Sequence, residues 1–227
     1  GLNQTADNAE RLLAGSLRGK GKNANAAEQV SAAQAAAPYA DAPTLSFMGQ
    51  GFAAAVPAGS DKDQAIANIE AFIDGSNANF IDAIVRGAAA YIKSAAADFV
   101  VVGIDEAVAF GSTVTNTAIM QAVIEAQPKV ISKIVTVAAI DTVATTEQIA
   151  TAAGLSGDEA TVGLAIGKLI KARGGKEVAA GDLTAAITSS IDALEASGRG
   201  DSIADIALQA TKASKDGSSV VTAAIGV

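Results

Sequence analysis

Residues 79–99 read NFIDAIVRGAAAYIKSAAADF and carry the clearest helical pattern in the chain. Apolar residues recur there at intervals of three and four, the spacing that aligns side chains along one face of an α-helix. Asn79 precedes them and is a residue type that commonly caps a helix N-terminus. The pattern predicts one long helix with a buried stripe made of Ile81, Ile84, Val85, Ala88, Ile92, Ala95, Ala96 and Phe99.

The run that follows, Phe99-Val100-Val101-Val102-Gly103, is the one stretch with strand character. β-Branched residues are enriched in strands, and glycine often marks the end of an element. The run continues a strong helical pattern, however. This position favours a continued helix or turn, with a strand as the alternative.

Further helices are predicted toward the C-terminus, each bounded by residues that commonly start or end helices. The segments do not recur at a fixed spacing, so the sequence does not predict a regular solenoid. They cover residues 113–127 before Pro128, 129–144, 147–153 before Gly154, 158–171, and two stretches that begin after the capping candidates Asp182 and Asp201.

The N-terminal residues differ from the rest of the chain. Residues 2–17 and 24–37 are helical candidates, and the basic stretch Arg18-Gly19-Lys20-Gly21-Lys22 separates them. Glycines in that stretch interrupt a helix. The basic stretch is either a solvated loop or a counter-charge for an acidic face of a neighbouring subunit.

Residues 38–60 are rich in Pro, Gly and Ala. A connection of this length is uncommon and is usually a linker, a functional loop or an arm that orders on a partner. Ser60-Asp61-Lys62-Asp63 then has the form of a capping box in front of a new helix. We therefore expect an N-terminal helical arm and linker over residues 1–60 and a helical core domain over residues 61–227.

Alanine dominates the composition: 54 of 227 residues are alanine, whereas the chain has six Phe, two Tyr and no Trp. Alanine has the highest helix propensity. It also buries little apolar surface, since a large apolar side chain contributes about 1.5–3 kcal/mol on burial and a methyl group less. We predict an all-α fold, a multi-helix array or bundle of short Ala-rich helices with an extended N-terminal arm, which gains part of its stability from neighbouring subunits.

Charge and residue usage exclude several function classes. The formal net charge is −8, and an acidic chain repels phosphate backbones, so we expect no nucleic-acid partner. The chain has no Cys and no His, which removes the thiolate nucleophile, the commonest general base and the commonest transition-metal ligands. We therefore expect no enzyme activity, no catalytic or metal-binding residues and no cofactor.

The same composition bears on location. The longest uncharged stretches are interrupted by Pro, Gly, Ser and Thr, so no membrane span is predicted. An absence of Cys, His and Trp together is uncommon in a cytosolic enzyme and fits an inert exported protein. We expect an extracellular or particle-associated location.

Residues 146–156, TEQIATAAGLS, have the form of the first helix and turn of a helix-turn-helix. In a DNA-binding unit, the next helix begins with residues that donate hydrogen bonds to base edges. Here Gly157-Asp158-Glu159-Ala160 follow, and the two carboxylates would face phosphate. The motif therefore predicts a packing unit.

The leading functional hypothesis is a self-assembling structural subunit of a homopolymer, such as an extracellular filament, sheath, tube or virion layer. Gly163 and Gly167 are small residues four apart on an apolar helix, which permits close helix approach either within the chain or between subunits. The candidate interface residues are Leu45, Phe47, Met48, Phe52, Gly163, Gly167, Val220, Val221 and Ile225.

The alternative hypothesis is a helical binding or scaffold module for a hydrophobic ligand or a partner protein. It predicts an apolar pocket near four phenylalanines. These are Phe72, Phe80, Phe99 and Phe110.

Overall fold

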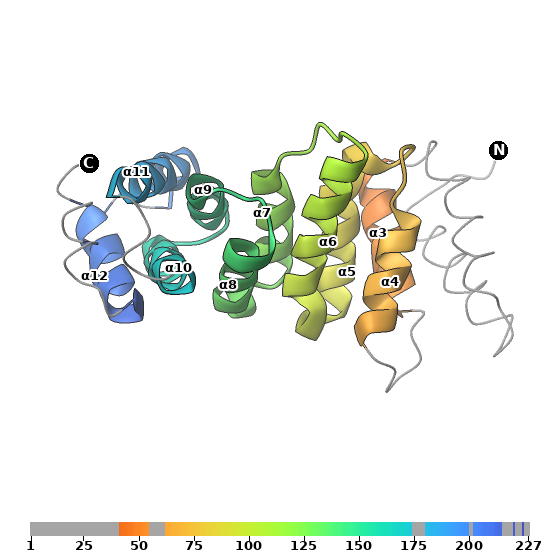
Figure 1. The fold of residues 1–227 in the computed structure, drawn as a ribbon, viewed down its shortest axis with the longest axis horizontal. Helices are drawn as coiled ribbons and strands as arrows, with labels where there is room; N and C mark the ends of the chain where they lie inside the picture. The colour runs from red at the N-terminus through yellow and green to blue at the C-terminus, as the bar shows by residue number, and fades with distance from the viewer. Residues whose placement is uncertain are drawn as a thin grey trace, which may run out of the picture. The chain divides into compact units, whose positions relative to one another are not determined.

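A computed structural model describes residues 41–54, 62–173, 180–199 and 202–214, together with Val220 and Ala224. In these residues the chain forms ten α-helices and no strand, which confirms the all-α multi-helix prediction (Figure 1). The predicted N-terminal arm lies mostly outside the described residues, so the arm-and-core boundary at residue 60 stays a prediction. The helices are α3 (Ala42–Ala54), α4 (Lys62–Phe72), α5 (Ile81–Tyr91), α6 (Ala96–Ala109), α7 (Asn116–Ala126), α8 (Ile131–Asp141), α9 (Thr146–Ser156), α10 (Glu159–Ala172), α11 (Ala180–Ala196) and α12 (Ile203–Ser214).

The chain divides into two compact units, Gly1–Thr115 and Asn116–Val227. In the first unit, the predicted long helix over residues 79–99 is two helices, α5 and α6. The backbone leaves the helical region at Ile92, with φ −107° and ψ 85°, and α6 packs against α5. Tertiary packing overrides the local pattern here, because a continuous helix would carry its second half away from the first. Most of the predicted stripe is still buried, but from two helices.

Asn79 does not cap α5, contrary to the prediction. The residue that precedes α5 is Phe80, and it makes no side-chain cap. Asn79 instead accepts hydrogen bonds through Oδ1 from the Thr113 backbone N–H at 3.2 Å and from the Thr113 hydroxyl at 3.1 Å. Its side chain therefore ties the loop after α6 to the start of α5.

The Val-rich run after Phe99 is helical, as expected. It lies inside α6, where Phe99, Val100, Val102 and Ile104 are buried. Burial on a helix face explains the β-branched residues, and no strand is needed.

Residues 38–60, predicted as a linker segment, contain helix α3. Asp41 begins the helix, because its Oδ1 accepts hydrogen bonds from the Thr44 N–H at 3.0 Å and the Thr44 hydroxyl at 2.6 Å. Pro43 lies in the first turn, where a helix tolerates proline. Pro and Gly indicated a linker, but here Pro43 lies in the first turn of a helix and Gly49 faces a neighbouring helix.

Helix α3 packs very closely on α5 at two glycines, one from each helix. A Cβ added to Gly49 would overlap the Ile84 carbonyl, and one added to Gly87 would overlap the Ser46 carbonyl. The pairing of residue 49 with 84 and of 46 with 87 shows that the two helices run antiparallel.

The second unit is a stack of three pairs of consecutive helices, α7–α8, α9–α10 and α11–α12, which we call hairpins although α11 and α12 hardly touch each other. Figure 1 shows α7, α9 and α11 in one row and α8, α10 and α12 in a second. Contacts between alternate helices are more extensive than contacts between consecutive ones. Each hairpin therefore buries its apolar surface mainly against the next hairpin, as in repeat architectures.

Helices α10 and α12, neighbours in the second row, run in the same direction. Near the start of the second row, the Ser202 N–H just before α12 donates to the Glu159 carboxylate of α10 at 2.7 Å. Near its end, Gly167 of α10 faces Ala213 of α12. The stack has no fixed sequence period because its loops differ in length. The α8–α9 connection runs from Asp141 to Thr146, whereas the α10–α11 connection runs from Ala172 to Ala180 and is longer.

Capping residues set several helix starts in this unit. Thr145 forms a capping box with Gln148 at α9, and Asp158 accepts the Thr161 N–H at 2.8 Å to begin α10. Asp182 lies within the first turn of α11 and does not precede it, so its predicted capping role is wrong. The predicted cap Asp201 lies outside the described residues.

Candidate subunit interfaces and a polar cleft

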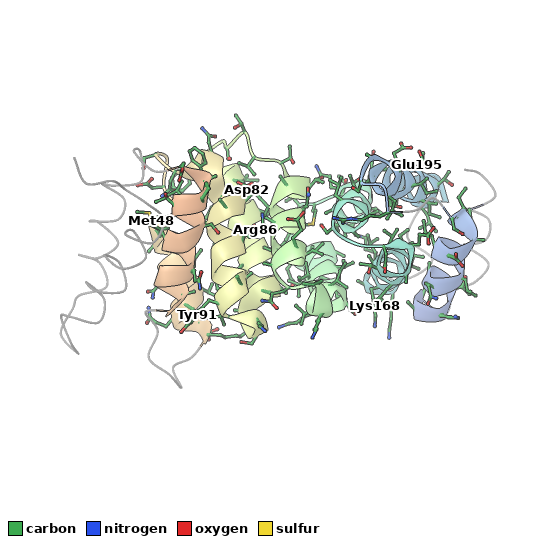
Figure 2. The ribbon with its side chains drawn as sticks, turned by 180° about the vertical axis from the view of Figure 1, so that it is seen from behind. Met48, Asp82, Arg86, Tyr91, Lys168 and Glu195 are labelled. Carbon is green, nitrogen blue, oxygen red and sulfur yellow. The ribbon has the colours of Figure 1, made fainter. Side chains whose placement is uncertain are left out.

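The predicted interface residues of the first unit lie on α3. Leu45 is fully buried, and Met48, labelled in Figure 2, is 6 % exposed. Phe47 and Phe52 are also on α3, but their side chains lie outside what the structure describes. Leu45 and Met48 are therefore part of the core of their own unit.

The two predicted glycines of α10 lie against α12 of the same chain. A Cβ at Gly163 would lie 2.6 Å from the Ile206 carbonyl oxygen, and one at Gly167 would lie 2.6 Å from the Ala210 carbonyl oxygen. Of the two roles that the spacing allowed, the structure places these glycines in a close intramolecular contact.

At the C-terminus, Val220 is fully buried. The other two predicted tail residues, Val221 and Ile225, lie outside the described residues.

Several large apolar side chains remain exposed, and sequence reasoning did not select them. Leu208 on α12 is 50 % exposed, although Ile206 and Ala210 on the opposite face of that helix are fully buried. Helical periodicity places residue 208 about half a turn from both. The other exposed large apolar residues are Tyr91 (labelled in Figure 2), Val108, Phe110, Ile140 and Val143.

The phenylalanines expected to line an apolar pocket have different environments. Phe72 and Phe99 are fully buried in the core of the first unit. Phe110, just after α6, is 44 % exposed. The structure therefore uses the first two as packing residues and leaves the third at the surface.

A polar cleft of about 490 Å³ lies in the second unit. Its lining comes from the α8–α9 loop, the first turn of α9, the C-terminus of α10 and the first two turns of α11. The lining residues are Thr142, Val143, Ala144, Thr145, Thr146, Glu147, Arg173, Asp182 and Ala185.

Arg173 is held firmly in this cleft. Its Nη1 donates to the Thr146 hydroxyl at 2.9 Å and its Nη2 donates to the Ala144 carbonyl at 2.7 Å. Both acceptors are neutral, and Arg173 forms no ion pair with any described residue. Sequence reasoning missed it because nothing in the local pattern around Ala172-Arg173-Gly174 indicates that the guanidinium reaches residues nearly thirty positions earlier.

Acidic residues that could have held a cation do not gather into a metal site. Among the described residues, no group of three or more Asp or Glu side chains could hold a metal ion. Asp98 pairs with Lys62 at 3.3 Å. Burial raises the pKa of Glu106, and the nearby charges of Glu70 and Asp105 raise it further.

The helix that follows the helix-turn-helix-like segment begins with acidic residues already in use. Asp158 caps α10, and the Glu159 carboxylate accepts the Ser202 N–H. Helices α9 and α10 contact each other and form a packing unit. No helix in the described ranges is long and apolar enough to cross a membrane.

Compared with protein-family models, with curated proteins and with solved structures, the chain shows no significant match.

Proposed function

We propose that this chain is a structural subunit that assembles with further copies of itself. The observation that carries the proposal is the stacking of helical hairpins in the second unit, where alternate helices provide most of the contacts. A hairpin in such a stack depends on its neighbours, so a hairpin with an exposed apolar outer face is a place where another can add.

The outer face of α12 offers a surface for that addition. Ala204 and Leu208 are exposed and lie four residues apart, so they share one face of the helix. That face points away from Ile206 and Ala210, the residues buried toward α10. Ala204 is a small residue, as are the glycines of α10 that pack against α12, so a second helix could approach this face closely.

The partner is a second copy of this chain, and its contact with α12 is heterologous. A contact between two different faces of identical subunits propagates into an open assembly unless it closes into a ring. The homopolymer expected from the composition follows directly from such a contact. An exported or particle-associated location and the absence of an enzymatic reaction are parts of the same proposal.

Negative-stain imaging of the full chain and of Leu208→Lys tests the α12 contact. Lysine preserves helix propensity but places a charge in the proposed contact. We expect particles longer than one subunit for the parent chain and their loss for Leu208→Lys.

The matched control is Ile140→Lys, because Ile140 is 60 % exposed on α8, a helix in the interior of the chain. This variant should assemble like the parent. Equal assembly by the parent and Leu208→Lys would remove the α12 contact from the proposal.

A further inference from the structure

The polar cleft of the second unit has a buried floor and an exposed rim. Ala144 is 2 % exposed and Thr146 is 7 % exposed, whereas Glu147 and Asp182 are exposed. Its volume of about 490 Å³ lies in the range of small-molecule sites, roughly 300–1,000 Å³. The cleft can therefore admit a small ligand from solvent.

The cationic side of the cleft is the Arg173 guanidinium. A guanidinium has five N–H donors, and only two of those of Arg173 are used within the described residues. The two bonds to Thr146 and Ala144 fix its plane, so little side-chain entropy is lost when a ligand binds. A guanidinium that is oriented and forms no ion pair with a described residue is suited to a carboxylate, which it can bind through two parallel hydrogen bonds.

The anionic side of the cleft comes from two helix N-termini. Glu147 lies in the first turn of α9 and Asp182 in the first turn of α11. Ser189 of α11 donates to Glu147 Oε1 at 2.9 Å and positions that side chain. These carboxylates repel a simple anion and attract an ammonium group.

We propose that this cleft binds a small zwitterionic molecule, whose carboxylate pairs with Arg173 and whose ammonium group pairs with Glu147 and Asp182. Val143 and Ala185, which also line the cleft, provide an apolar surface for the carbon chain between the two charges. Opposite charges on one ligand would match a cleft that is lined by one guanidinium and two carboxylates. This site is separate from the α12 contact and does not rest on self-assembly.

The test is a titration of the full-length ¹⁵N-labelled Leu208→Lys chain, which should stay unassembled and keeps the cleft intact, followed by amide chemical shifts. The ligands are three zwitterions of increasing length: glycine, 4-aminobutyrate and 6-aminohexanoate. Acetate and methylamine, which each carry one of the two charges, are the ligand controls. We expect saturable shifts at residues 142–147 for at least one zwitterion, with a Kd at least about tenfold lower than that of either control ligand.

Two variants test the assigned contacts. Asp182→Asn removes one carboxylate at an exposed position, and Arg173→Lys keeps the charge but removes the planar fork. Each should raise the Kd of the best zwitterion by about tenfold. The matched controls are Asp192→Asn, at an exposed acid elsewhere on α11, and Arg199→Lys, whose parent guanidinium donates to the Leu155 carbonyl outside the cleft. Both should leave the Kd unchanged.

The proposal is overturned if no zwitterion saturates below about 10 mM, a very weak limit for a specific site. It is also overturned if acetate binds as tightly as the best zwitterion, or if Asp182→Asn leaves the Kd unchanged. The result for Asp182→Asn can be read even if Arg173→Lys fails to fold, because Asp182 is exposed and its replacement should not disturb the fold.

Discussion

At the residue scale, glycines decide how closely the helices approach. Gly87 of α5 lies directly against the Ser46 carbonyl, so its replacement by alanine forces α3 and α5 apart. We expect Gly87→Ala to lower the free energy of unfolding by roughly 1–3 kcal/mol, the usual cost of overpacking. Urea denaturation followed by circular dichroism measures this. Gly75→Ala is the control, because an added Cβ there would lie 4.0 Å from the Phe110 ring. A similar loss of stability in Gly75→Ala would contradict the explanation.

Asp158 gives a pH-dependent prediction at the same scale. Hydrogen bonds from the side chain and backbone of Thr161 hold the pKa of Asp158 below its usual value. A lowered pKa in the folded state means that the contribution to stability is complete above the unfolded value of about 4 and is lost as the pH falls through the folded value. At pH 7, Asp158→Ala should cost about 1 kcal/mol, typical of a lost N-cap.

The control for this prediction is Asp158→Asn, because asparagine is also a good N-cap. It should retain most of the stability at pH 7. Denaturation at a series of pH values should show the difference between the parent and Asp158→Ala shrinking below about pH 4. A difference that stays constant down to pH 2 would show that the carboxylate charge plays no part.

Ionisation of Glu106 changes the stability of the fold in the opposite direction. Burial, Glu70 and Asp105 raise its pKa, so the ionised form is less favourable in the folded chain than in the unfolded one. Its ionisation therefore destabilises the fold above the folded pKa, and this effect disappears in acid. Glu106→Gln should stabilise the chain at pH 7 by a few tenths of a kcal/mol, the size of a like-charge repulsion at a helix surface. Thermal melts of the parent and of Glu106→Gln at pH 7 and pH 3 measure this difference. A stability gain that persists at pH 3 would contradict the explanation.

At the element scale, the sequence predicts helices well and their partners poorly. Helices α7 to α10 follow from apolar spacing bounded by Pro128 and Asp158. The break at Ile92 could not be predicted, because tertiary packing of α6 on α5 outweighs a local pattern that continues through it. Helix α3 was missed because Pro43 and Gly49 indicate a loop until the close neighbour of Gly49 is known.

The candidate sites show the same limit. The Gly163 and Gly167 pair could be predicted as a close contact, but its partner, α12, could not. The cleft could not be predicted, because Arg173 and Thr146 meet only through the stacking of α9 and α10. Local patterns report which surface is apolar, whereas long-range pairing depends on how the hairpins stack.

In a stack of hairpins, we expect α12 to open locally without the opening of α7. Gly167→Val would force its side chain against Ala213 and the Ala210 carbonyl. Because repeat units contact mainly their neighbours, the effect should fall on α12 and leave α7 nearly unchanged. Hydrogen exchange by mass spectrometry should show faster exchange in α12 with little change in α7. Equal acceleration in both helices would indicate one cooperative unit instead.

At the scale of the whole molecule, the account rests on stacking that continues beyond one chain. Small side chains allow close contacts but bury little surface each, and the exposed Leu208 face of α12 is where a second copy is proposed to add. The most direct measurement is sedimentation velocity of the full chain from about 1 µM to about 100 µM, which spans the usual range of weak self-association. The account predicts a sedimentation coefficient that rises with concentration as larger species form. A single monomeric boundary at every concentration would contradict it.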